Sequence, residues 1–507
     1  MILDNGTIRT LDPALPTAAA LAIAGDRIVG GVGTHETALA SPDVVDLGGR
    51  CVVPGITDSH THFPTWAAAR RVIRLEDATS AEDAAARMAT GVAAVAPGRW
   101  LRAQGFRESN WPAPPTKEIL DAVTGDVPAA VISKDFHAVW LNSAGILRTG
   151  GDLRRYAVPG GVVELGADGE PTGLLREESA WRFKEDHLEL SDEEYLEAMR
   201  DGLKVASSRG VTAIHDKDGW IPAVPRLWQE LERDDALPIR VWQSLPHEHL
   251  DRLGEIGLAS GLGERVRVGY LKVFMDGTLG SRTALMTDGS GVEITSREEL
   301  ADILRRAARA RWPVAVHAIG DRANRNALDA FAETKEEWRP LGLRHRVEHA
   351  QCLRPEDVPR FAELGLTASV QFSHAPSDEE LARRFWADRL EGVYSFRSLL
   401  DAGTRLVNGS DAPIEELDPW GGIVAGVLRH WREGQRITVE DALVASTLAP
   451  AWLTYDERRR GKLLPGYLAD LVVLDRDPFA IPVEELPGVQ VVATMVGGRW
   501  THNPPPW

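Results

Sequence analysis

Two histidines separated by one residue, His60 and His62, follow a short apolar run that begins at Cys51. Side chains alternate faces along a strand, so both rings would point the same way if the run ends as a strand. Neutral imidazole is a common ligand of zinc and related transition metals, and such a pair could hold one ion. Read alone, the motif could equally be a chance pair in a turn, so its meaning depends on the rest of the chain.

Four further polar side chains stand at the ends of apolar runs: Lys272, His317, His349 and Asp411. Taken singly, His317 and His349 could be hydrogen-bonded core histidines, and Asp411 could be a helix cap. An unpaired ammonium inside the apolar run around Lys272 would be costly, so it must reach solvent, pair with a carboxylate or be chemically neutralised. Their shared position predicts one site, because barrels of parallel strands carry their chemistry where the strands end.

The middle of the chain alternates strand-like and helix-like segments. Short serine- or threonine-led helix starts, such as Ser191 with Glu194, lie between several of the apolar runs. Strands alternating with helices indicate a parallel sheet, and about eight such units favour a closed (β/α)8 barrel of the TIM type, an α/β fold. The apolar runs cover residues 129–133, 211–214, 239–245, 268–275, 313–317, 345–347, 367–372 and 406–408.

The two ends of the chain share a different texture of short strands and glycine turns. We expect residues 1–53 and 462–507 to pair into one small composite β-sandwich domain, because short exposed strands are marginal alone; two separate flaps are the alternative. Residues 54–461 would then form the barrel. The stretch at about 66–209 is much longer than one crossover connection needs, and predicts an inserted subdomain.

The overall composition narrows the class of protein. The chain has 507 residues and a formal net charge of -18, which disfavours nucleic acid and anionic membranes as partners, since both need a basic face. Only Cys51 and Cys352 are present, which fits a reducing compartment. No segment is apolar and long enough to suggest a membrane helix or a secretory signal. We therefore expect a cytoplasmic protein that acts on a small molecule.

Taken together, these motifs resemble the amidohydrolase superfamily, and more closely its amidohydrolase family 3 branch. That branch contains the YtcJ-like metal-dependent hydrolases, which include N-substituted formamide deformylases. The resemblance covers nearly the whole chain, and its segments occur in the expected order. The matching stretches are residues 54–62, 169–173, 210–216, 272–284, 317–322, 344–351, 409–413 and 466–474.

The resemblance implies a set of ligands for one or two divalent metal ions. His60 and His62 would hold one ion, His317 and His349 a second position, and Asp411 would act as ligand and proton carrier. Lys272 matches a lysine that many superfamily members carry as a carbamate bridging two metals. Zinc is the expected ion, although manganese, iron or nickel would also suit these ligands. A homodimer is a further expectation from the resemblance.

The implied activity is hydrolysis of a carbon–nitrogen bond outside ordinary peptides, in an amide, N-acyl or N-formyl group. Metal-activated water would be the nucleophile, Asp411 the general base and acid, and His374 an oxyanion or substrate contact, or else a supporting residue. The alternatives are ester, carbamate or cyclic amide hydrolysis, and a non-hydrolytic relative acting as an isomerase or binding protein. His137, Arg282 and Trp66 are the candidate substrate contacts.

Overall fold

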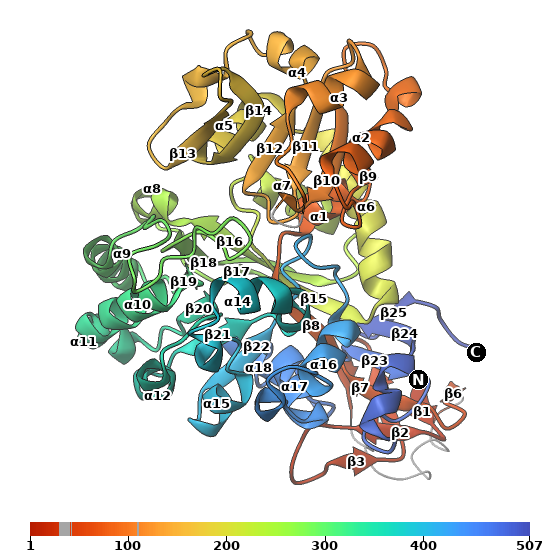
Figure 1. Cartoon of the computed structure of the whole chain (residues 1–507). Helices are drawn as coiled ribbons and strands as arrows, with labels where there is room; N and C mark the ends of the chain where they lie inside the picture. The colour runs from red at the N-terminus through yellow and green to blue at the C-terminus, as the bar shows by residue number, and fades with distance from the viewer. Residues whose placement is uncertain (30–40, 42, 109–110) are drawn as a thin grey trace.

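The computed structural model describes residues 1–29, 41, 43–108 and 111–507, and its central sheet is a barrel of eight parallel strands (Figure 1). Each strand pairs with the next one along this series, and a two-residue strand, β17 (Leu262–Gly263), adds to one of them. The predicted (β/α)8 barrel is confirmed. Its strands are β8 (Ile56–Thr61), β15 (Val211–Asp216), β16 (Arg240–Pro246), β18 (Val266–Phe274), β19 (Val314–Ala318), β20 (Arg346–His349), β21 (Thr367–Val370) and β22 (Arg405–Asn408).

The barrel closes where the segment after β22 meets the end of β8. The backbone N–H of Asp411 donates to the carbonyl of His60 at 2.7 Å, and that of His62 donates to the carbonyl of Ala412 at 2.8 Å. A Cβ atom on Gly409 would lie 2.4 Å from the His60 backbone nitrogen, so only glycine allows this approach. Closing the barrel therefore brings Asp411 beside both histidines of the first motif.

Helices on the outside of the barrel bury the apolar faces of its strands. Reciprocal capping boxes start three of the predicted helices, at Ser191–Glu194, Ser296–Glu299 and Thr438–Asp441. Within the described part of the chain, every helix is too short or too polar to cross a membrane. The main barrel helices are α6 (Asp192–Ser208), α7 (Val224–Arg233), α8 (Leu250–Glu255), α9 (Arg297–Arg309), α10 (Asp321–Glu333), α12 (Val358–Leu364), α15 (Phe396–Asp401), α16 (Pro419–Val427), α17 (Val439–Ser446) and α18 (Leu448–Leu453).

Strands from both ends of the chain form one β unit, which is red and blue in Figure 1. In one sheet, β23 (Leu471–Leu474) runs antiparallel to β7 (Cys51–Pro54), flanked by β24 (Val491–Val496), β25 (Arg499–His502), β2 (Thr7–Arg9) and β3 (Thr17–Ala18). The other sheet contains β5 (Arg27–Ile28), β4 (Leu21–Ala24), β1 (Ile2–Asp4) and β6 (Val44–Asp46). The two sheets share one apolar core, which is what the predicted composite sandwich requires.

The inserted subdomain is a six-stranded mixed sheet covered by helices, orange in Figure 1. Its elements are β9 (Ile73–Arg74), α2 (Ala81–Ala89), β10 (Leu101–Phe106), α3 (Lys117–Thr124), β11 (Ala129–Ser133), β12 (Ala138–Leu141), α4 (Ser143–Arg148), β13 (Gly161–Leu165), β14 (Pro171–Glu177) and α5 (Glu178–His187). The apolar run at 129–133 therefore belongs to this sheet, and β8 supplies the remaining barrel strand. The sequence pattern alone places this run among the barrel strands, because a buried strand has the same composition in either sheet.

Candidate metal centre and active-site pocket

Three of the predicted ligands form a compact buried group at the mouth of the barrel. His60, His349 and Asp411 each present a ligand atom within 4.8 Å of the others. The Oδ1 atom of Asp411 lies 3.2 Å from His60 Nε2 and 3.6 Å from His62 Nε2. Ligands bound tetrahedrally to one zinc at about 2.0–2.2 Å stand roughly 3.4 Å apart, so these spacings suit a shared ion.

The chemistry of these donors also fits a divalent metal. Imidazole nitrogens and a carboxylate are the ligands that zinc and its neighbours accept. The Nε2 atom of His60 is fully buried and makes no well-aligned hydrogen bond among the described residues; its close neighbour at 3.2 Å is the Asp411 carboxylate, itself a predicted ligand. A buried polar atom left unpaired is costly, so this nitrogen indicates a missing partner at the site.

The other nitrogen of each histidine ring in this group is held by a neighbouring side chain. Such bonds fix the ring orientation and the tautomer, and so aim the free nitrogen. The sequence motifs do not predict these partners, although a charge inside a buried strand, as at Glu348, is a signal that points to one of them. The Nδ1 contacts are His60 with Glu348 at 2.8 Å, His62 with Asp218 at 2.8 Å and His349 with Gln371 at 3.0 Å.

Glu348 belongs to a charged cluster inside the barrel. Its Oε1 atom lies 3.0 Å from Lys217 Nζ and 2.7 Å from Arg346 Nε, and all three side chains are fully buried. Burial alone would raise the pKa of Glu348, but Arg346 and His60 outweigh it and hold this pKa well below its usual range. Glu348 is therefore an anion at neutral pH, and the two cations keep it beneath His60.

Lys272 and His317, two more of the predicted ligands, lie next to this group and line the same cavity. Lys272 is 1% exposed, its Nζ atom sits 4.8 Å from the centre of the Phe274 ring, and no described carboxylate lies within ion-pair distance. Burial lowers the pKa of Lys272, against the raising effect of the charge on Glu348. The His317 ring centre is 4.5 Å from that of His349, and His317 Nε2 donates to a backbone carbonyl at 3.2 Å, which leaves Nδ1 free. Three outcomes were possible for the Lys272 ammonium. The structure shows neither access to solvent nor an ion pair with a described carboxylate, which leaves chemical neutralisation.

Two of the ligand candidates have unusual backbone conformations. Asp411 has φ +57° and His349 has φ +72°, a region that residues other than glycine seldom adopt. Such strain costs about 1–3 kcal/mol per residue and concentrates at functional sites. Burial would raise the pKa of Asp411, but His60 and His349 hold it well below its usual range. Asp411 is thus an ionised carboxylate with its ring neighbours around it.

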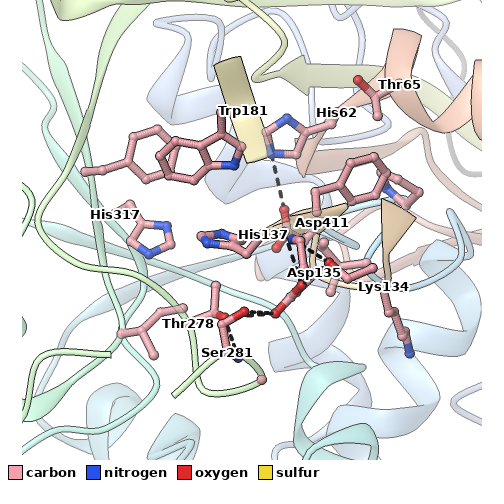
Figure 2. A pocket seen from close by; sticks show the side chains of 18 of the residues that line it. His62, Thr65, Lys134, Asp135, His137, Trp181, Thr278, Ser281, His317 and Asp411 are labelled. Carbon is pink, nitrogen blue, oxygen red and sulfur yellow. Dashed lines mark hydrogen bonds and ion pairs between the residues drawn. The ribbon is translucent and has the colours of Figure 1, made fainter. Parts of the chain in front are cut away.

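A cavity of about 580 Å³ opens beside these ligands, with the inserted subdomain forming part of its wall. Figure 2 shows His62, His317 and Asp411 around one space, with His137 and Trp181 from the inserted subdomain pointing into it. His374 also lines the cavity, and its Nε2 atom lies 3.9 Å from Asp411 Oδ2. The volume is typical of a pocket for a small organic molecule.

Two predicted substrate contacts are not in this cavity. Trp66 is fully buried on α1 (Phe63–Ala69), where its ring packs 5.2 Å from Phe63 and its Nε1 donates to Glu416. Arg282 is exposed and lies against the ring of Phe385, outside the cavity lining. A helix carries the Trp66 side chain away from the mouth, and the loop after β18 carries that of Arg282 away from it.

Comparison with known proteins agrees with this geometry. The model of the amidohydrolase family matches residues 43–502. The chain is 30% identical to amidohydrolase YtcJ of Bacillus subtilis (strain 168), covering 94% of this chain and 95% of the relative. It is 26% identical to an N-substituted formamide deformylase of Arthrobacter pascens, covering 98% and 97%. A solved structure of an uncharacterized metal-dependent hydrolase from Pyrococcus horikoshii superposes with a TM-score of 0.77, at 29% identity, covering 95% and 99%. The family match includes the barrel, the insertion and part of the terminal β unit, so the chain belongs to the amidohydrolase family.

Proposed function

We propose that this protein is a metal-dependent hydrolase that cleaves a carbon–nitrogen bond outside ordinary peptides, in an amide, N-acyl or N-formyl group. The observation that carries the proposal is the convergence of His60, His62 and His349 on Asp411 at the mouth of a pocket. Family membership supports hydrolysis, and a relative named as a deformylase of N-substituted formamides supports this class of bond. In the reaction, water adds hydroxyl to the carbonyl carbon and hydrogen to the nitrogen, which gives a carboxylic acid and an amine.

The residues at the strand ends would hold the metal. His60, His62 and Asp411 suit one ion, with His317 and His349 beside a second position, and zinc is the ion we expect. A bound divalent metal polarises a carbonyl and lowers the pKa of water from about 15.7 to near 7. Lys272 would serve as a further ligand in the form of a carbamate: the nitrogen of its neutral amine bonds to the carbon of carbon dioxide, one N–H proton leaves to solvent, and an anionic carboxylate takes the place of a buried ammonium.

Asp411 carries the proton in this proposal. Its carboxylate is ionised and faces the pocket, so it accepts a proton from the attacking water and returns it to the leaving nitrogen. Proton transfer of this kind contributes about 10²- to 10⁴-fold to rate. His374 lies beside Asp411 and would contact the substrate there, with its Nδ1 atom held 3.3 Å from Gln351 Nε2.

The experiment is metal analysis of the purified protein followed by a screen of N-formyl and N-acyl amines with their matched esters. We expect bound zinc and faster hydrolysis of the nitrogen compounds, and loss of that activity in Asp411→Asn. Asp401→Asn is the matched control, because this aspartate is exposed and paired only with a surface arginine. Faster turnover of the esters would replace the proposed bond class, and an Asp411→Asn variant as active as the parent would refute the proton-transfer assignment.

A further inference from the structure

One histidine of the inserted subdomain faces the metal ligands from across the pocket. His137 stands in the turn between β11 and β12, and it lines the same cavity as His317 and Asp411 (Figure 2). His137 belongs to the inserted subdomain and not to the barrel. The insertion therefore adds an imidazole to the pocket, beyond the polar groups at the strand ends.

The ring of His137 is fixed by contacts on several sides. Its Nδ1 atom is 2.6 Å from Glu177 Oε2, and both side chains are less than a tenth exposed. The backbone N–H of Glu177 donates to the His137 carbonyl at 2.7 Å, and the ring of Trp181 packs edge-on with centres 5.1 Å apart. Among the described residues, none hydrogen-bonds to His137 Nε2. That nitrogen is the only part of the ring left to meet a ligand.

The backbone around this pair is held in uncommon conformations. Glu177 has φ +52° where β14 passes into α5, and Phe136 has φ +63° in the turn before His137. Asp135 anchors the same turn to the barrel, because its Oδ2 accepts from Ser281 Oγ at 2.6 Å. Backbone strain of this kind persists where the surrounding structure demands a particular side-chain position. Here the surrounding structure holds Glu177 next to the His137 ring and fixes the turn at the barrel mouth.

The charge on this pair suits a hydrogen-bond donor. Burial alone would lower the pKa of His137, but the charge of Glu177 and its hydrogen bond to the ring outweigh burial and raise it. Glu177 therefore favours the doubly protonated ring, whose Nε2–H points into the pocket. A fixed cationic donor in a partly enclosed site stabilises developing negative charge without having to reorient.

We propose that His137 is a catalytic residue that donates a hydrogen bond from Nε2 to the carbonyl oxygen of the substrate as negative charge develops on it, with Glu177 as its positioning residue. The inference rests on the proposed hydrolase function and adds to it. No bond to His137 forms or breaks, and its proton stays on Nε2 throughout.

The first experiment measures turnover by the zinc-loaded full chain with the best substrate from the screen. We expect His137→Ala, which leaves no side-chain donor, to lower kcat by about 10²- to 10³-fold, the usual effect of removing one oxyanion donor, while KM and zinc content stay near the parent values. Glu177→Gln keeps an acceptor oxygen for the Nδ1–H and removes only the charge, so kcat should fall by less at unchanged KM. Imidazole added to His137→Ala should restore part of the lost rate.

The second experiment measures binding of methylphosphonate by calorimetry, as a tetrahedral anion that resembles the proposed oxyanion. His137→Ala should weaken binding strongly and Glu177→Gln less so. The matched controls are His430→Ala and Glu379→Gln, because His430 Nε2 and Glu379 Oε2 form a similar pair at 2.8 Å with the histidine side chain 66% exposed. Neither control should change turnover or methylphosphonate affinity.

Three results would overturn the assignment. His137→Ala with parental kcat and methylphosphonate affinity would remove His137 from the chemistry. A rise in KM alone would make it a binding residue, and loss of zinc would make it a metal ligand. If the parent hydrolysed no amide, the proposed function would fail separately, and the methylphosphonate measurement would still decide whether His137 meets an oxyanion.

Discussion

Two buried aspartates at opposite ends of the barrel show how differently one carboxylate can be used. Asp470, at the base, accepts a two-pronged contact from Arg240 at 2.8 and 3.0 Å and a further bond from Arg460 at 3.2 Å. Asp411, at the mouth, is surrounded by histidine rings instead. Both carboxylates have a lowered pKa, so a low pKa alone does not identify the working one.

What distinguishes the two sites is the state of the neighbouring donors. Around Asp470, guanidinium groups and the backbone N–H of Gly497 can only donate, so the group is complete as it stands. Around Asp411, His60 Nε2 makes no well-aligned hydrogen bond to any described residue and could bind a cation, and the backbone of Asp411 itself is strained. The base is thus organised for stability, and the mouth presents a group of donors that suits a metal ion.

The strongest test of this comparison is Asp411→Asn. We expect hydrolysis by the zinc-loaded protein to fall by about 10²- to 10⁴-fold, because the amide cannot carry the proton. Steady-state kinetics and metal analysis of the same preparation would measure this. The fold should survive, since asparagine fills the same space; a variant that unfolds and loses activity together would show that Asp411 is structural, as Asp470 is.

The corresponding change at the base is Asp470→Asn, for which we expect a loss of stability and no loss of activity. Removing one partner of a buried ion pair costs about 3–5 kcal/mol, because Arg240 and Arg460 keep their charges without compensation. We expect the free energy of unfolding in urea to drop by this amount, while zinc content and kcat of the folded fraction stay parental. If Asp470→Asn lost kcat and kept its full stability, the two aspartates would not differ in the way proposed here.

Glu348→Gln tests whether the carboxylate that orients His60 contributes to metal binding at the barrel mouth. Carboxylates that orient a ligating histidine usually contribute 10- to 100-fold, as an order-of-magnitude estimate, to metal affinity. We expect zinc affinity, measured by competition with a chelator, to fall by about that factor. Gln371→Glu is a useful second variant, because it places a negative charge next to Nδ1 of His349. Unchanged affinity in Glu348→Gln would make the Lys217–Arg346–Glu348 cluster part of the structural core.

Acid should weaken the base through Asp470. Its pKa is lowered from 3.8 to about 2, chiefly by Arg240, against the raising effect of burial. A lowered folded-state pKa gives stability that is complete above the unfolded value of 3.8 and is lost as the pH falls towards 2, here about 2 kcal/mol. The difference in unfolding free energy between parent and Asp470→Asn should therefore shrink from pH 5 to pH 2.5. A constant difference would mean that charge on Asp470 does not stabilise the fold.

The sequence predicted the barrel, the composite β unit and the six residues at the mouth because those features are local or follow from strand ends. Apolar runs mark strands, and polar residues after them lie together once the sheet is parallel. The partners Glu348 and Asp218 and the pair His137–Glu177 depend on contacts between distant segments. Nothing in the chain near Glu177 shows that it meets a residue 40 positions earlier.

Arg282 and Trp66 both lie outside the cavity lining, and Arg282→Gln gives the smallest predicted effect. The Arg282 side chain is exposed and contacts the ring of Phe385, so replacing it should change stability by no more than about 0.5 kcal/mol. Turnover should also stay parental, measured with the same substrate as Asp411→Asn. A clear loss of kcat or a rise in KM would mean that the loop after β18 turns inward when substrate binds, and that the pocket wall extends beyond the residues that line it here.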